Sequence, residues 1–217
     1  MRLALLGPPG SGKGTQAERI CAAFDLVHLA SGDILRSEKA SGSPLGKQIR
    51  DFIDNGLLVP DGLMIELMKQ KILGLKKGFV LDGFPRTLPQ AQSLNRMLFE
   101  NDRPLELVLN FVVNPKVLSR RFEGRRVCPV CLSVYHIDSL PPAVEGICDH
   151  DGAKLIVRED DRPEVVQKRI ATYQETMAPL IAYYAQLGNF KTLDTSASID
   201  EVTKMVLDKI RRHFDDE

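Results

Sequence analysis

The stretch GPPGSGKGT, residues 7–15, decides the fold of this chain. It ends the apolar run RLALLG (2–7) and opens a segment of helical spacing that extends to about Phe24. Gly7, Gly12 and Lys13 fit the pattern G-x-x-x-x-G-K, whose glycines let backbone N–H groups point at phosphate oxygens. The helix N-terminus adds a positive dipole, and Lys13 adds a mobile charge. We therefore predict a phosphate-binding loop between a buried strand and a helix.

The loop departs from the general pattern at one position. A Ser or Thr commonly follows the lysine and meets magnesium, but here Gly14 follows and Thr15 comes next. The Thr15 hydroxyl therefore acts either on the metal through water or on an α-phosphate. Asp82 ends the apolar strand at 78–82 and is a second candidate for magnesium, because carboxylate oxygens suit this ion. The alternative is an ordinary aspartate in a turn at the strand end.

The composition sets limits on the class of protein. The chain has 217 residues, 43% of them hydrophobic and 27% charged, which is enough for one sizeable core with small insertions. Lys+Arg and Asp+Glu are both 29, so the neutral balance does not favour binding to nucleic acid. No apolar run is as long as a membrane span, and MRLALLG is a strand pattern rather than a secretion signal. We expect a cytoplasmic protein that needs neither nucleic acid nor membrane.

Apolar strand patterns alternate with amphipathic helix patterns along most of the chain. This alternation predicts an α/β fold with a parallel sheet covered on both faces. We expect Pro179 to interrupt the last long helix but one. The expected strands are 2–7, 25–31, 78–82, 105–113 and 190–194, and the expected helices are 13–24, 61–73, 88–98, 114–126, 163–187 and 198–214.

Two segments do not fit the alternation. Residues 30–59 contain two helices with no strand between them, and Ser31 is the expected N-cap of the first. Residues 125–162 contain prolines, glycines, three cysteines and short β-like runs. We interpret both as insertions on one core made of 1–29, 60–124 and 163–217.

Several arginines lie where they can converge on phosphate. Their planar, forked N–H donors match phosphate oxygens, and phosphoryl transfer depends on positioning and charge more than on covalent catalysis. No Ser-His-Asp or Cys-His arrangement stands out among the four histidines, so acyl transfer and proteolysis have no support. The candidates lie in the GFPR turn, at strand ends, in the first insertion and at insertion boundaries: Arg36, Arg86, Arg121, Arg125, Arg126, Arg158 and Arg169.

The motifs together resemble one family over nearly the whole chain. In order and spacing they match the adenylate kinases, in the long-lid form common in bacteria: GPPGSGKGTQA (7–17), SGDILR (31–36), GLLVPD (56–61), LDGFPRTLPQA (81–91), GRRVC (124–128), VYH (134–136), DDRPEVVQKRI (160–170) and APLIAYY (178–184). The resemblance implies a P-loop NTPase-type fold with a parallel five-stranded sheet flanked by helices. It also implies a helical NMP-binding segment at 30–59 and a small β-rich lid with zinc at 125–162.

The resemblance implies a reversible, Mg²⁺-dependent reaction, ATP + AMP ⇌ 2 ADP, that serves purine nucleotide salvage and energy homeostasis in a monomer. For ATP it implies contacts from Gly10, Ser11, Gly12, Lys13, Gly14, Thr15, Arg121, Arg125, Val134, Tyr135 and Ala197. For AMP it implies Ser31, Arg36, Leu57, Leu58, Val59, Gly83, Phe84, Pro85, Arg86, Gln90, Arg158 and Arg169.

Roles follow from the same resemblance. It implies that Lys13 and the arginines at 86, 121, 125, 158 and 169 are catalytic. It also implies that Gln90 contacts the AMP base, and that Thr15 and Asp82 contact magnesium through water. Ser31 stands where Thr is commoner but keeps the hydroxyl. Ala197 stands where relatives often have Lys, so a contact there has to come from the backbone.

Three cysteines in the second insertion indicate a metal site. Cys128 and Cys131 are separated by two residues, and Cys148 precedes Asp151 by three positions. Thiolates suit zinc, an aspartate oxygen is allowed beside them, and the family's metal-bearing lids show this spacing. Asp151 is therefore favoured as the fourth ligand, with His150 as its rival. Four protein ligands close the coordination shell, so we expect a structural role.

Two alternative functions remain open at this point. A kinase for another nucleoside monophosphate shares the motifs, although the long lid and Gln90 favour AMP. A phosphate-loop ATPase with a nucleic-acid-binding zinc ribbon is the alternative from another class. The neutral charge and the scarcity of aromatic residues, 6% of the chain, count against it.

Overall fold

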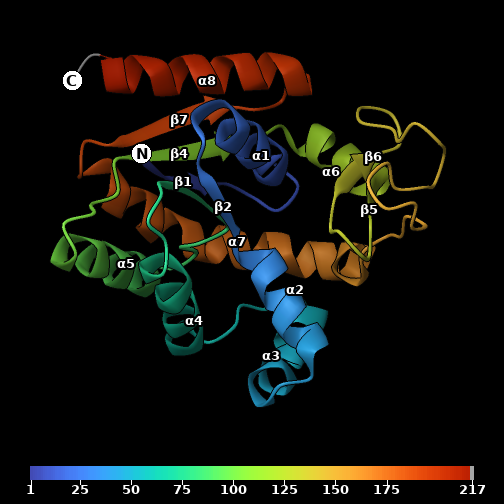
Figure 1. Ribbon diagram of the computed structural model, residues 1–217, viewed down its shortest axis with the longest axis horizontal. Helices are drawn as coiled ribbons and strands as arrows, with labels where there is room; N and C mark the ends of the chain where they lie inside the picture. Colours follow the sequence, from blue (N-terminus) through green and yellow to red (C-terminus); the bar gives the residue numbers. More distant parts are fainter. Residues whose placement is uncertain (216–217) are drawn as a thin grey trace.

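The computed structural model describes residues 1–215 and confirms the predicted fold class. In this part of the chain, one sheet has five parallel strands in the order β2-β3-β1-β4-β7 (Figure 1). The strands are β1 (Arg2–Leu6), β2 (Val27–Ala30), β3 (Phe79–Asp82), β4 (Leu107–Val112) and β7 (Phe190–Asp194).

Alternate side chains of the strands enter two separate cores, as the period of a strand requires. In β1, Leu3 and Leu5 pack with residues of α1 (Lys13–Phe24) and α8 (Ile199–Asp215). Ala4 and Leu6 pack on the opposite face. The helices that contribute to that second core are α4 (Asp61–Leu73), α5 (Leu88–Glu100) and α7 (Pro163–Ala185). Both faces of the sheet are therefore covered, which explains why its three central strands, β3, β1 and β4, are almost wholly apolar.

Helix α7 corrects one expectation about the chain. It continues through Pro179, which we predicted would interrupt it. A proline inside a helix removes one backbone hydrogen bond, but tertiary packing can hold the helix together. Met177, Leu180 and Tyr184 are buried in the core around this position. The packing of these side chains on both sides of the proline accounts for the unbroken helix.

The two insertions project from the core (Figure 1). The first consists of α2 (Ser31–Ser41) and α3 (Pro44–Asp54), which pack against each other. The second follows α6 (Pro115–Gly124) and contains the antiparallel pair β5 (Arg125–Val127) and β6 (Val134–His136). The short 3-10 helix η1 (Glu159–Asp161) leads from it into α7.

Most element boundaries differ from the sequence prediction by one or two residues, and two of these differences have a clear structural cause. Ser31 is the first residue of α2 and not its N-cap, because its hydroxyl turns to the sheet and donates to the Gly83 carbonyl at 2.7 Å. The helix expected to end at 126 stops at Gly124, because Arg125 already pairs with His136 in the small sheet. Among residues 1–215, no helix has both the length and the apolar character needed to cross a bilayer.

Candidate active site

Glycines shape the loop between β1 and α1, in which the Ser11 N–H donates to the Pro8 carbonyl at 3.1 Å. Gly10 has φ +81°, and a Cβ there would lie 2.8 Å from Leu118 and 2.9 Å from Phe122, so α6 leaves no room for a side chain. Gly12 precedes α1, whose first turn has no side-chain cap and no acidic residue. The first N–H groups of a helix lack intrahelical partners. An anion is therefore the fitting partner for this end of α1.

Lys13 lies folded back into the loop. Its Nζ donates to the carbonyls of Gly7 at 2.9 Å and Pro8 at 2.8 Å, and lies 3.3 Å from Ser11 Oγ. Burial lowers the pKa of Lys13 to about 7, although the charge of Asp82 opposes this shift. The ammonium therefore lacks a full counter-charge, which a phosphate group would supply.

Asp82 lies at the end of β3, against the first turn of α1. A Cβ at Gly14 would be 3.5 Å from Asp82 Oδ2, and the same oxygen lies 3.4 Å from His28 Nε2. Burial would raise the pKa of Asp82, but His28 and Lys13 outweigh it and lower the pKa. The carboxylate is thus kept ionised beside Gly14 in the first turn of α1, in a place where it can face a hydrated cation.

Two cavities adjoin each other, and the larger one is lined by this loop. The larger one extends from the loop to the insertion that contains β5 and β6, and the smaller one lies between α2, α3 and the turn after β3. Seven lysine and arginine side chains but only three aspartate and glutamate side chains line the larger cavity, among the residues that the structure describes. Arg36, Arg86 and Arg169 line both cavities. Such an excess of positive charge fits a polyanion that extends from one cavity into the other.

Buried carboxylates hold the arginines in place. Asp161, whose side chain is fully buried, accepts from Arg125 Nε at 2.7 Å in a bidentate pair and from Arg169 Nη1 at 3.2 Å. Arg169 also donates to the Asp160 carbonyl at 2.8 Å. Burial and, next, the charge of the neighbouring Arg36 lower the pKa of Arg158 to about 10. The arginines are thus oriented before any ligand binds, and their mutual repulsion favours an added anion.

Most of the predicted site residues line one or both cavities. The larger cavity is lined by Gly10 to Thr15 of the loop. The smaller one is lined by Ser31, Leu57 to Val59 and Gln90. Of the nucleotide-binding residues that the resemblance implies, two do not line either cavity. Phe84 is 2% exposed and packs in the core, and Ala197 contributes a carbonyl that accepts from Arg121 Nη2 at 3.2 Å. Arg121 also donates to the Ser11 carbonyl at 3.1 Å, so it ties the loop to the segment after β7.

Comparison with known proteins identifies the same family as the sequence motifs, and the match covers most of the chain. The adenylate kinase family model matches residues 5–189. An adenylate kinase of Caldanaerobacter subterraneus subsp. tengcongensis is 45% identical over 204 residues, which are 93% of this chain and 92% of that protein. Adenylate kinases of Staphylococcus epidermidis and Staphylococcus aureus are each 43% identical over 210 residues, 96% of this chain and 98% of theirs. The chain belongs to the adenylate kinase family.

This adenylate kinase family member is accordingly a nucleoside monophosphate kinase, and the charged, two-part cavity described above is its candidate active site. Sequence reasoning missed several of its polar residues. Asp160 and Asp161 orient arginines, and His28 pairs with Asp82. The two aspartates stand just before the helix that starts at Pro163, and acidic residues between Arg158 and Arg169 were a signal that could have found them.

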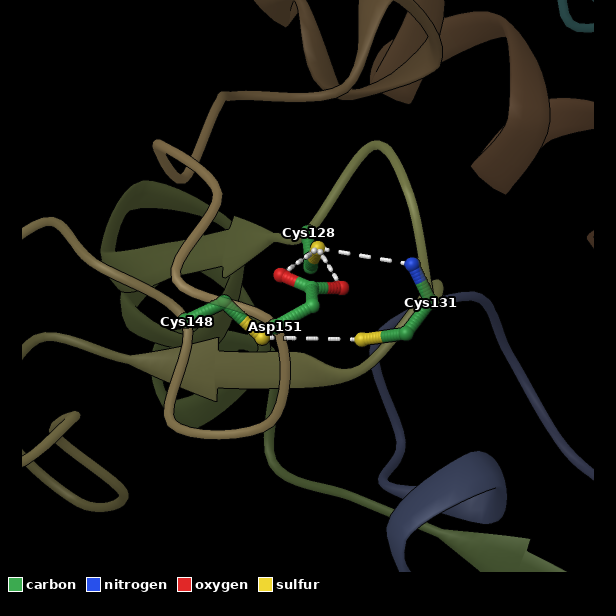
Figure 2. A group of neighbouring side chains, drawn as sticks. All are labelled: Cys128, Cys131, Cys148 and Asp151. Carbon is green, nitrogen blue, oxygen red and sulfur yellow. Dashed lines mark hydrogen bonds between the residues drawn. The ribbon is translucent and has the colours of Figure 1, made fainter.

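The second insertion of the family member brings the four predicted metal ligands together (Figure 2). One ligand atom from each of Cys128, Cys131, Cys148 and Asp151 lies within 4.8 Å of all the others. The sulfurs of Cys131 and Cys148 are 3.5 Å apart, close to the roughly 3.8 Å that two thiolates on one tetrahedral zinc ion require. Asp151 Oδ2 is 3.2 Å from Cys128 Sγ, whereas His150 takes part through its backbone N–H to Cys148 Sγ. The donor set therefore fits a tetrahedral ion, with Asp151 as fourth ligand.

The lowered pKa of Lys13 gives a direct prediction for nucleotide binding. At pH 8.5 a group of pKa about 7 is almost wholly neutral, and contact with phosphate raises its pKa. We expect ATP binding at this pH to take up about one proton per chain. Calorimetry in two buffers of different ionisation enthalpy measures this number. Lys13→Met should abolish the uptake, and ATP binding without proton uptake by the unchanged protein would contradict the assignment.

Proposed function

We propose that this protein transfers the terminal phosphoryl group of ATP to AMP, giving two ADP, within the two joined cavities. The observation that carries the proposal is the ring of arginines at their junction, where Arg36, Arg86 and Arg169 line both cavities. ATP would occupy the larger cavity, with its phosphates on the glycine loop and Lys13. AMP would occupy the smaller one, which is lined by Leu57 to Val59 and Gln90.

The transfer is a single displacement at the γ-phosphorus. An ionised oxygen of the AMP phosphate forms the new bond while the bond to the β-phosphate oxygen breaks, so the acceptor needs no general base. Lys13 and the arginines stabilise negative charge on the transferring oxygens, and their fixed positions hold the two phosphates in line. Magnesium supplies further neutralisation of the ATP phosphates, and Thr15 and Asp82 are the residues that would hold its water ligands.

We further propose that residues 30–59 and 125–162 move as units relative to the core. Ion pairs link the two units in the present arrangement. Lys39 of α2 bonds to Asp54 of α3 and lies 3.4 Å from Glu159, and Arg36 lies 3.7 Å from Asp160. Closure of both units over the nucleotides would exclude water, which otherwise competes with AMP as the acceptor.

Zinc is the ion that we propose for the cysteine cluster, because three thiolates and one carboxylate suit it. The ion would be structural, because the buried cluster of the insertion comprises only Cys128, Tyr135, Cys148 and Leu155. The remaining expectations are a monomer, because residues of one chain line both cavities, and a cytoplasmic location, because reduced thiols suit that compartment. The neutral charge supports the absence of a nucleic-acid partner.

Removal of the ion tests the structural role. We expect chelation to lower the melting temperature by about 5 °C or more, because the small cluster loses the bonds that fasten it. Cys131→Ser, at an exposed ligand, should reproduce the loss and make the protein insensitive to chelator. Cys21→Ser in α1 is the matched control and should keep the response. An unchanged melting temperature after metal analysis shows full removal would refute the role.

The acceptor nucleotide is tested by a panel. ATP and Mg²⁺ are held saturating, and AMP, GMP, CMP and UMP are compared by kcat/KM. We expect AMP to exceed each of the others by at least about a hundredfold, because a site built on hydrogen bonds rejects bases that leave its groups unpaired. Equal use of another nucleoside monophosphate would favour the alternative kinase.

A further inference from the structure

Asp61 lies behind the smaller cavity and contacts Gln90, which lines it. It is the first residue of α4, two positions after the Leu57–Val59 stretch. Gln90 lies in the first turn of α5 and lines the cavity, although the residue is only 2% exposed. Asp61 itself is not among the residues that line either cavity. Any effect of Asp61 on a ligand must therefore pass through Gln90 or its neighbours.

The contacts of Gln90 fix the direction of its amide. Nε2 donates to Asp61 Oδ1 at 2.7 Å, and Oε1 accepts from the backbone N–H of Arg86 at 2.8 Å. A carboxylate only accepts and a backbone N–H only donates. A reversed amide would therefore set oxygen against oxygen and N–H against N–H at these two contacts. The Thr87 hydroxyl also donates to Asp61, at 2.9 and 3.0 Å, and so joins the starts of α4 and α5.

The fixed amide leaves one N–H and one oxygen lone pair of Gln90 for a ligand. An amide of this direction can pair with adenine, whose 6-amino group donates beside a ring nitrogen that accepts. A 6-oxopurine has the opposite order, because its carbonyl accepts beside an N1–H that donates. It would need the reversed amide.

We propose that Asp61 is a positioning residue that fixes the direction of the Gln90 amide and so selects a 6-aminopurine over a 6-oxopurine in the acceptor nucleotide. The inference rests on the proposed function, in which Gln90 reads the base of AMP. Its simplest rival is a purely structural role, in which Asp61 joins α4 to α5 through Thr87. Loss of a purely structural contact between α4 and α5 would lower kcat/KM for all acceptor nucleotides alike. The ratio of kcat/KM between two acceptors therefore distinguishes the two roles.

The test compares AMP with inosine monophosphate, the 6-oxopurine that differs from it only at this edge. Asp61→Asn keeps the shape but replaces a carboxylate by an amide that can pair with either direction of Gln90 at this contact, so that only the Arg86 N–H still favours the present direction. We expect the AMP-to-IMP ratio of kcat/KM to fall by about tenfold or more, through a higher KM for AMP and a lower one for IMP. The kcat with AMP should stay within about threefold, because the phosphoryl-transfer arginines are untouched.

Three further variants make the result decisive. In a Gln90→Leu background, Asp61→Asn should leave the ratio unchanged, because no amide remains to be oriented. Thr87→Val is the matched control for the junction of α4 and α5, and it should lower stability but keep the ratio within about twofold. Asp61→Ala is measured beside Asp61→Asn. It supplies the AMP-to-IMP ratio of kcat/KM if Asp61→Asn does not fold.

Each outcome separates the inference from the proposed function. An unchanged ratio in both Asp61 variants, with AMP still preferred by the unchanged protein, overturns the role of Asp61 and leaves the kinase assignment standing. Equal use of AMP and IMP by the unchanged protein overturns the assignment of Gln90 and the role of Asp61 together. A fall in the ratio that depends on Gln90 supports the inference.

Discussion

Replacement of Lys13 by methionine should lower kcat for ADP formation by about a thousandfold. The lysine supplies the only charge within the glycine loop, and its Nζ already lies among the carbonyls of Gly7 and Pro8. Its interaction with phosphate strengthens as charge moves onto the transferring group, so its loss acts on turnover more than on ATP binding. Steady-state assays with both nucleotides saturating measure the change.

Stability distinguishes loss of chemistry from loss of fold in this variant. The pKa of Lys13 is about 7 in the folded protein against an ordinary 10.5, so protonation disfavours the fold. The unfavourable contribution is complete below about pH 7 and fades as the pH rises toward 10.5. Lys13→Met should therefore melt no lower than the unchanged protein at pH 6.5. Lys77→Met, which removes an exposed ion pair with Asp25, is the matched control and should keep full activity.

Arg86→Lys should lower kcat by about a hundredfold or more, although it keeps the positive charge. Arg86 lines both cavities, and its Nε donates to the Gly83 carbonyl at 2.6 Å, which directs the rest of the fork at the junction. A lysine ammonium cannot present two parallel donors to phosphate oxygens. The phosphoryl group in transfer would therefore lose a bidentate contact. Single-turnover measurements should show a lower rate of the chemical step.

The control for this variant is Arg19→Lys. Arg19 lies on α1 and pairs with Asp200 at 2.6 Å, and it does not line either cavity. We expect its kcat to stay within about twofold of the unchanged protein. If Arg86→Lys kept full turnover as well, the junction of the two cavities would not be where the phosphoryl group is transferred.

The sequence predicted the core of the fold because its signals are local. Glycine positions, apolar strands and amphipathic helices indicated the parallel sheet and the loop, and the structure confirms both. The expected break at Pro179 was wrong, since buried contacts of the neighbouring Met177 and Leu180 outweigh the lost backbone bond. The N-cap role of Ser31 was wrong for a similar reason, because β3 continues into a turn whose Gly83 carbonyl takes the hydroxyl.

The site could be predicted only where a motif carried it. The loop, the arginines and the cysteine spacing each have a chemical pattern that is visible in the chain. The groups that orient these residues have no such pattern in the sequence. Asp161 faces Arg125 across 36 positions and Asp61 faces Gln90 across 29, so these pairs depend on how the elements pack. Phe84 lies within the DGFPR motif, but its side chain is buried in the core, which the motif does not indicate.

Calorimetry with two adenosines joined through five phosphates tests the central claim most directly. If the cationic ring holds two nucleotides end to end, one molecule of this ligand should bind per chain and compete with both ATP and AMP. The same titration with Arg86→Lys should give much weaker binding. Binding that competes with only one of the two nucleotides, or two ligand molecules per chain, would contradict the account.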